Sequence, residues 1–221
     1  MMIKKLEGKS MKYSVIIVAA GSGSRMNLGY NKVYYPLNGV TILEQTMKKF
    51  ESDIRCTQIV VVTEGNDYKQ HTNHYNGKIV VVRGGDTRQE SVFNGLCAVK
   101  EDVVFVHDGA RPFVTASSLD RLCESLTCND AAILMVPCKD TIKIVENGFV
   151  KETLERSKLM HAQTPQAFKT KLLLECYQKA FTDNYLGTDD ASLVERYSNA
   201  NIAVVEGDYK NIKITTKEDI K

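Results

Sequence analysis

Short apolar runs rich in β-branched residues alternate along the chain with segments of helical periodicity. The runs lie at residues 13–19, 58–63, 78–83, 103–107 and 131–137. Between them, segments such as 41–53 and 117–127 repeat their apolar residues at helical spacing. Continuous apolar strands separated by helices are typical of a sheet that is covered on both faces. The alternation therefore predicts an α/β fold with a mostly parallel sheet and helices on both of its faces.

The rest of the chain extends this pattern. Further helices are predicted at 170–181 and 189–197, and further strands at 202–206 and 211–215. Thr87 followed by Glu90, and Thr215 followed by Glu218, have the spacing of a capping box, in which two side chains bond the backbone at the start of a helix. Both positions are therefore predicted helix starts.

The segment TIKIVENGFVKETL (141–154) departs from the α/β pattern. It consists of two alternating runs around Asn147-Gly148, which is the strongest short signal for a β-hairpin. We expect an inserted β-hairpin arm over 138–156. It carries more apolar surface than a free two-stranded hairpin can bury, and such hairpins are marginal alone. We therefore expect the arm to pack on a partner subunit, with packing against its own domain as the alternative.

Length and charge exclude several classes of protein. The 221 residues suit a single domain over 1–221, in which the charged segment 1–10 is an extension. With 29 basic and 27 acidic residues the net charge is only +2, so no global field recruits nucleic acid or a membrane surface. The six cysteines include no CxxC pair, which favours reduced thiols and a cytoplasmic location.

A glycine-rich stretch, AAGSGSRM, follows the first predicted strand. The small residues that allow backbone amides to approach a phosphate are Ala19, Ala20, Gly21 and Gly23. The dinucleotide fingerprint fails because Met26 stands at its third glycine position. The simpler interpretation is a tight strand-to-helix connection in which Arg25 and Lys32 are merely solvated.

Two further loops follow predicted strands, where ligands bind in sheets of this kind. The first, GGDTRQES, offers Asp86, Arg88 and Ser91 to a base or sugar. The second, HDGARPF, presents Asp108 beside Arg111. Asp108 could simply cap a turn, or it could lie near a metal ion or hydroxyl beside a cation that grips phosphate.

Three later segments add candidate residues. ERSKLMHAQTPQAF carries Arg156 and Thr164, GTDDAS carries Thr188, and NIKITT carries Lys213 between two isoleucines, so that Lys213 is expected to point away from two buried side chains. The four histidines lack zinc spacing, and no Gly-x-Ser-x-Gly motif occurs. Hydrolysis through a covalent nucleophile is therefore disfavoured.

Taken in order, these motifs resemble the 2-C-methyl-D-erythritol 4-phosphate cytidylyltransferase family. The likeness runs from about Lys12 to Ile220 through AAGSGSRM, GGDTRQESV, VHDGARPFV, QTPQAF, GTDDASLVE and NIKITTKED. It implies a Rossmann-like nucleotidyltransferase fold and a homodimer joined by the arms. The implied reaction joins CTP to 2-C-methyl-D-erythritol 4-phosphate, a polyol phosphate, with release of pyrophosphate.

The resemblance also implies residue roles. The implied catalytic cations are Arg25, Lys32, Arg156 and Lys213. The implied nucleotide-binding residues are Ala19, Ala20, Gly21, Gly23, Gly85, Asp86 and Ser91. The implied substrate-binding residues are Asp108, Arg111, Thr141, Thr164 and Thr188, with Arg111, Thr141 and Arg156 reaching across the dimer. Mg²⁺ is expected on the triphosphate, with Asp108 as its protein contact.

General chemistry agrees with that reaction. A phosphate monoester has a second pKa of about 6, so at neutral pH it attacks as an anion without a strong general base. Positioned cations and a metal then stabilise the charge that develops on the α-phosphate. Two alternatives stay open: the sister reaction with ribitol 5-phosphate, and a nucleotide sensor that binds without turnover.

Overall fold

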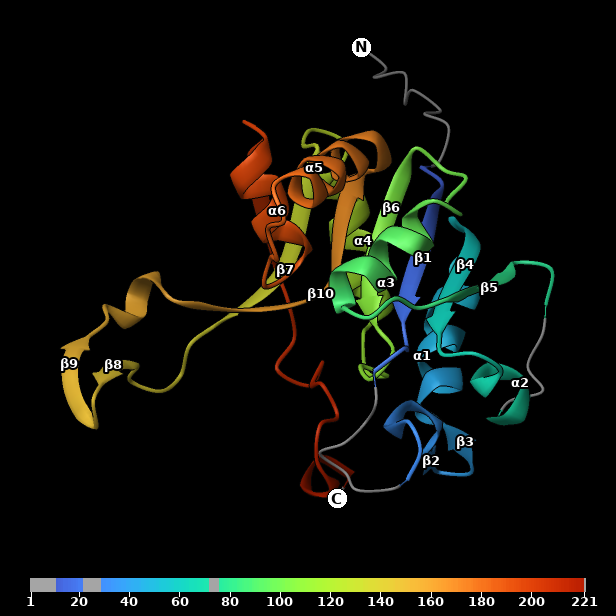
Figure 1. Ribbon diagram of the computed structural model, residues 1–221, viewed down its shortest axis with the longest axis horizontal. Helices are drawn as coiled ribbons and strands as arrows, with labels where there is room; N and C mark the ends of the chain where they lie inside the picture. The colour runs from blue at the N-terminus through green and yellow to red at the C-terminus, as the bar shows by residue number, and fades with distance from the viewer. Residues whose placement is uncertain (1–10, 22–28, 72–75, 221) are drawn as a thin grey trace, which may run out of the picture.

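The computed structural model describes residues 11–21, 29–71 and 76–220, and shows a seven-stranded sheet with helices on both sides (Figure 1). The order of the strands in the sheet is β11-β7-β10-β6-β1-β4-β5. Their bounds are β1 Tyr13–Val18, β4 Cys56–Thr63, β5 Ile79–Arg83, β6 Val103–Asp108, β7 Ala131–Pro137, β10 Met160–Lys169 and β11 Ile202–Glu206. All the strands predicted between residues 13 and 137 are present, and the predicted fold class is confirmed.

One central strand was not predicted. β10 lies between β6 and β7 and runs antiparallel to both, whereas the other neighbouring strands pair in parallel. Its polar residues and Pro165 resemble a loop, yet Gln163, Thr164 and Gln166 are all buried. These side chains have partners within the protein, which is how a polar segment can occupy the middle of a sheet.

Helices cover both faces of the sheet. Their bounds are α1 Ile42–Glu51, α2 Asp67–His71, α3 Arg88–Leu96, α4 Ala116–Ser125, α5 Thr170–Thr182 and α6 Asp190–Tyr197. One apolar cluster joins α1, α2 and α4 to side chains such as Val15 and Phe105, which project from one face. A second joins α3, α5 and α6 to side chains such as Ile16 and Val104, which project from the other. Alternate strand residues thus serve two cores, as a doubly covered sheet requires.

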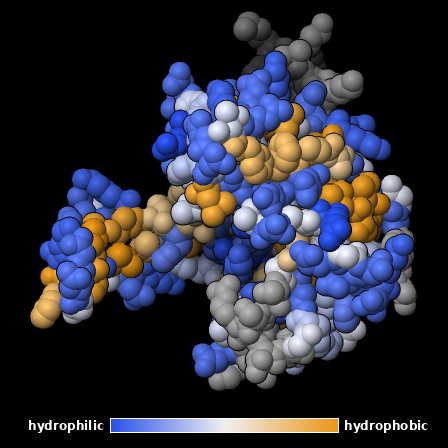
Figure 2. All heavy atoms as spheres, in the orientation of Figure 1, coloured by the Kyte–Doolittle hydropathy of each residue, from blue (hydrophilic) through white to orange (hydrophobic). Residues whose placement is uncertain are grey.

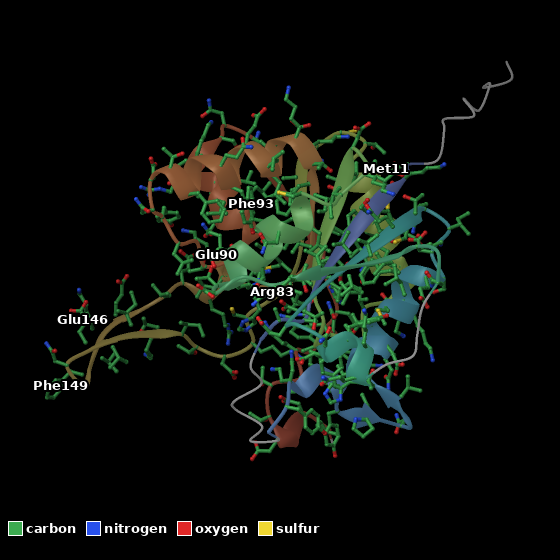
Figure 3. The ribbon with its side chains drawn as sticks, turned by 45° about the vertical axis from the view of Figure 1, so that its right-hand side comes forward. Met11, Arg83, Glu90, Phe93, Glu146 and Phe149 are labelled. Atoms are coloured by element: carbon green, nitrogen blue, oxygen red, sulfur yellow. The ribbon has the colours of Figure 1, made fainter. Side chains whose placement is uncertain are left out.

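The inserted arm is a two-stranded hairpin of β8 (Lys143–Glu146) and β9 (Phe149–Thr153). Asn147 and Gly148 both have positive φ, as the predicted turn requires. Figure 1 shows the arm extending away from the sheet beyond the ends of β7 and β10. Every residue of β9 is exposed. Figure 2 shows apolar surface on the arm, and Figure 3 places Phe149 at its far end.

Short elements complete the fold. A small hairpin pairs β2 (Pro36–Leu37) with β3 (Val40–Thr41), and 3-10 turns lie at η2 (Lys32–Tyr34), η3 (Arg156–Lys158) and η4 (Lys217–Ile220). Within the described ranges, no helix combines the length and apolar character needed to cross a membrane.

The predicted strand at 211–215 is absent. The segment crosses the end of the sheet in an irregular path, and Ile214 donates a backbone hydrogen bond to Ala110 O rather than joining a ladder. Ile214 is buried as expected, but Ile212 is exposed. The capping box proposed for Thr215 and Glu218 is also wrong, because the backbone N–H of Thr215 donates to the Asp219 carboxylate instead.

Candidate active site

A cavity of about 600 Å³ opens at the carboxyl ends of β1, β5 and β6. Nine of the residues to which the resemblance assigns a role line it: Ala19, Ala20, Gly21, Lys32, Gly85, Asp86, Ser91, Asp108 and Lys213. Lys213 reaches it from the irregular segment that follows β11. Gly23 and Arg25, also predicted for this site, lie outside the described residues.

The loop between β5 and α3 forms one wall, and its own side chains hold it rigidly. Thr87 and Glu90 form the predicted capping box, and the Glu90 carboxylate also accepts a hydrogen bond from Asp86 N at 2.7 Å. Ser91, which is buried, accepts from Gly85 N at 3.1 Å. A Cβ on Gly85 would come within 2.4 Å of Glu90 Cβ, so only glycine fits this turn. Figure 3 shows Glu90 on the first turn of α3.

Asn31 positions Lys32 on the opposite wall. Its side-chain amide donates to Ala19 O at the end of β1, and its side-chain oxygen accepts from Val33 N at 3.2 Å, capping η2. This ties the turn that carries Lys32 to the loop after β1. Lys32 lines the cavity, yet only 9% of its surface is exposed to solvent. Sequence reasoning missed Asn31, although asparagine one residue before a short helix is a recognisable cap.

Asp108, at the end of β6, is the centre of a cluster of cations. Its Oδ2 lies 3.1 Å from Lys213 Nζ and 3.1 Å from Arg111 Nε, and its Oδ1 lies 4.0 Å from Arg88 Nε. Burial alone would raise the pKa of this carboxyl, but Lys213, Arg88 and Arg111 together hold the pKa well below its usual range. Asp108 is therefore an anion at every physiological pH.

Behind Asp108, two buried side chains fix its backbone. Thr164 Oγ1 accepts a hydrogen bond from Asp108 N at 3.0 Å and lies 3.1 Å from His107 Nδ1. His107 Nε2 lies 3.0 Å from Arg111 O, a carbonyl that can only accept, so Nε2 carries the proton and Nδ1 accepts from Thr164. Complete burial lowers the pKa of His107 to about 4, and the ring is neutral at pH 7. Thr164 thus supports the cavity from behind and does not line it.

Arg88 has a different partner from the one the sequence suggested. It lines the cavity, but its guanidinium makes two hydrogen bonds to the Asp190 carboxylate, at 2.7 and 3.2 Å. Asp190 begins α6 and is fully buried. Arg88 is therefore held toward α6 and Asp108 rather than toward a base or sugar. No sequence pattern indicates this pairing, because 102 positions separate the two residues.

Besides Thr164, four predicted residues lie outside the cavity lining. Arg156 and Thr141 lie exposed in the arm, and Arg156 Nη1 donates to Lys139 O at 3.0 Å. Thr188 is exposed just before α6. Arg111, expected to act across a dimer, packs against Asp108 of its own chain and donates to Asn211 O at 2.7 Å. Within one chain, therefore, these residues do not complete the site.

Comparison with known proteins decides the family of the chain. The model of the 2-C-methyl-D-erythritol 4-phosphate cytidylyltransferase family matches residues 13–221. The chain belongs to this family. It is therefore a nucleotidyltransferase, as the motifs predicted, and the ribitol 5-phosphate alternative is not favoured.

Relatives within the family are similar over nearly their whole length. The chain is 46% identical to the 2-C-methyl-D-erythritol 4-phosphate cytidylyltransferase of Geobacillus thermodenitrificans, covering 95% of this chain and 94% of the relative. It is 44% identical to that of Bacillus licheniformis, covering 95% and 93%. The crystal structure of the Francisella tularensis cytidylyltransferase is 38% identical and superimposes with a TM-score of 0.84, covering 95% and 96%.

Proposed function

We propose that this cytidylyltransferase joins CTP to 2-C-methyl-D-erythritol 4-phosphate by in-line attack of the substrate phosphate on the α-phosphorus of CTP. The P–O bond to the leaving pyrophosphate breaks as the new bond forms. The observation that carries the mechanism is a single cavity in which two glycine-rich loops face a cluster of cations around Asp108. The loops suit a nucleotide, and the cations suit a second, phosphorylated substrate.

The nucleotide end of the site is built from backbone. Ala19, Ala20 and Gly21 on one wall, and Gly85 and Asp86 on the other, bring peptide groups and one carboxylate to the cytidine portion. The hydrogen bonds from Gly85 and Asp86 to the first turns of α3 hold this wall before the nucleotide arrives. Such preorganisation limits the entropy lost on binding.

The cations act on the phosphates. Lys32 lines the cavity beside the loop after β1 and, together with Arg25, is proposed to stabilise the charge on the α-phosphate in the transition state. Lys213 faces the same cavity from its contact with Asp108 and is proposed to hold the attacking phosphate in line. The substrate phosphate is largely dianionic at pH 7, so no side chain has to remove a proton first.

Mg²⁺ is the proposed cofactor, and among the described residues Asp108 is its one proposed protein ligand. The described residues contain no group of three or more potential metal ligands from His, Cys, Asp and Glu. Asp108 supplies one carboxylate that remains ionised and faces the cavity. A single carboxylate suits Mg²⁺, which keeps several waters and takes its other ligands from phosphates. When bound, Mg²⁺ would neutralise charge on the triphosphate.

The arm is proposed to complete the site in a homodimer located in the cytoplasm. Val145, Phe149 and Val150 are 57%, 79% and 63% exposed, which is a large apolar surface for a hairpin of two short strands. A second copy of the chain would cover this surface. The same contact would bring Arg156 and Thr141 to the partner's cavity, where they would join Thr188 around the polyol phosphate.

Pyrophosphate release tests the proposal directly. The purified protein is given CTP and Mg²⁺ with 2-C-methyl-D-erythritol 4-phosphate in one reaction and ribitol 5-phosphate in a second. We expect release only in the first. Release only with ribitol 5-phosphate would replace the substrate, and CTP binding without release in either reaction would make the protein a nucleotide sensor.

A further inference from the structure

Arg88 connects two parts of the structure that are distant in sequence. It begins α3, while its partner Asp190 begins α6, and both helices cover the same face of the sheet (Figure 1). The pairing is bidentate, with Nη2 at 2.7 Å and Nη1 at 3.2 Å from the two carboxylate oxygens. Tyr177 Oη from α5 donates to the same carboxylate at 2.5 Å. Asp190 is fully buried, so its charge is compensated within the protein.

The guanidinium is thereby fixed beside the active-site carboxylate. Nε of Arg88 lies 4.0 Å from Asp108 Oδ1, and the Arg88 side chain, which is one-third exposed, is part of the cavity lining. Because Asp190 binds both Nη1 and Nη2 of the planar guanidinium, Nε can point in only one direction. Asp108 thus has a fixed positive charge on its Oδ1 side, while Lys213 and Arg111 share its Oδ2 side.

This charge arrangement affects Lys213. Three cations surround Asp108, and two carboxylates, Asp108 and Asp190, oppose them, so the cluster carries one more positive than negative charge. A positive charge beside Oδ1 weakens the attraction of Asp108 for the Lys213 ammonium. The Lys213 ammonium can then turn toward an arriving phosphate without leaving Asp108 uncompensated.

We propose that Arg88 is a positioning residue that, held by Asp190, balances the charge of Asp108 so that Lys213 is released to the phosphate of the polyol substrate. The inference rests on the proposed function, because it concerns binding of the second substrate in that reaction. Without Arg88, Asp108 retains Lys213 more strongly, and the incoming phosphate must compete for it. The nucleotide loops keep their own hydrogen bonds, so CTP binding is unaffected.

The test compares Arg88→Gln with Arg55→Gln. Arg55 provides a matched control because it also bridges two carboxylates, Asp53 and Asp120, each at 2.7 Å, and neither it nor its partners line the cavity. For Arg88→Gln we expect the KM for 2-C-methyl-D-erythritol 4-phosphate to rise about tenfold while the KM for CTP is unchanged. Arg55→Gln should lower the unfolding temperature and leave both KM values unchanged.

Two further variants separate positioning from structural support. Arg88→Lys keeps the charge but loses the bidentate pairing, and should restore part of the lost KM. If Arg88 acts through Lys213, then Arg88→Gln should have little further effect on the KM in a Lys213→Ala background. Additive effects of the two substitutions would overturn the proposal, as would equal changes in both KM values.

Wild-type turnover separates this inference from the function on which it rests. If the wild-type protein releases no pyrophosphate with CTP and 2-C-methyl-D-erythritol 4-phosphate, the proposed function fails and the inference fails with it. If the wild type turns over and Arg88→Gln behaves as Arg55→Gln does, only the inference about Arg88 is wrong.

Discussion

The predicted site residues on the cavity walls are held by contacts within their own chain, whereas those on the arm are exposed. Around the cavity, each described wall is held by its own chain: Asn31 ties Lys32 to the loop after β1, and Glu90 and Ser91 hold the loop after β5. In the arm, Arg156 is exposed and β9 is exposed along its whole length. One chain is thus sufficient to order the nucleotide end, whereas the arm residues require a surface that the chain alone does not provide.

Lys32→Ala should have the largest effect, because it removes a cation from the cavity wall. We expect turnover to fall by roughly 10²- to 10³-fold, the range for losing one electrostatic contact to a transition state. Pyrophosphate release measures the loss. Lys48→Ala, at an exposed position of α1, is the control and should be neutral. Near-normal turnover of Lys32→Ala would remove this residue from the mechanism.

The buried support behind Asp108 should appear in the pH dependence of stability. Burial lowers the pKa of His107 to about 4, whereas an unfolded histidine titrates near 6.5. Between these values the unfolded chain binds a proton that the folded chain does not, so lowering the pH destabilises the fold. We expect the free energy of unfolding to decrease by up to about 3 kcal/mol from pH 6.5 to pH 4.

Urea unfolding at a series of pH values measures this dependence. The Asp108 carboxyl, whose folded pKa is held low, also destabilises the fold below about pH 5, where an unfolded aspartate begins to bind a proton, so the His107 contribution is read from the slope between pH 6.5 and pH 5. Stability that stays constant between pH 6.5 and pH 5 would show that His107 is not held neutral by burial.

Mixing two impaired variants tests whether the arm of one chain acts on the active site of its partner. Arg156→Ala should reduce turnover about 10- to 100-fold, the loss expected for a charged contact to phosphate. When Arg156→Ala and Lys32→Ala chains are mixed and allowed to exchange, half of the dimers are mixed and each has one intact site. Activity should then recover to about a quarter of the wild-type value. Failure to recover, with exchange demonstrated, would assign Arg156 to its own chain.

Phe149→Ser should give the smallest effect, on assembly alone. Phe149 is 79% exposed in the single chain, so the change should leave monomer stability within about 0.5 kcal/mol. If a partner buries this ring, dimer dissociation should become easier by about 1–2 kcal/mol. Analytical ultracentrifugation measures the difference. Ile54→Ser, at an 88% exposed position on the body, is the matched control and should leave assembly unchanged.

The predicted features share a local origin. Apolar runs and capping residues identified most of the parallel sheet, the start of α3 and the hairpin turn, because short stretches of sequence determine each of them. Nine of the residues singled out by motif line one cavity for a related reason, since loops after parallel strands meet at one edge of the sheet.

The features that were missed depend on distant partners. β10 is polar because Gln166 bonds Asp189 and Ala191, and because Thr164 bonds Asp108 and His107. The segment 211–215 alternates like a strand, but only Ile214 enters a core, where it packs with Ile42. The Arg88–Asp190 pair links residues 102 positions apart. The spacing of residue types within a short stretch of sequence cannot reveal contacts between residues that are far apart along the chain.

The position of β10 also constrains the order of events as the chain is made. β6 and β7 do not pair with each other, and both pair with β10, which ends at Lys169. Until the ribosome has delivered β10, β6 and β7 each present an open strand edge, and such edges attract other chains. The centre of this enzyme, including the backbone of Asp108, can therefore close only late in synthesis, and until then its strand edges remain open to other chains.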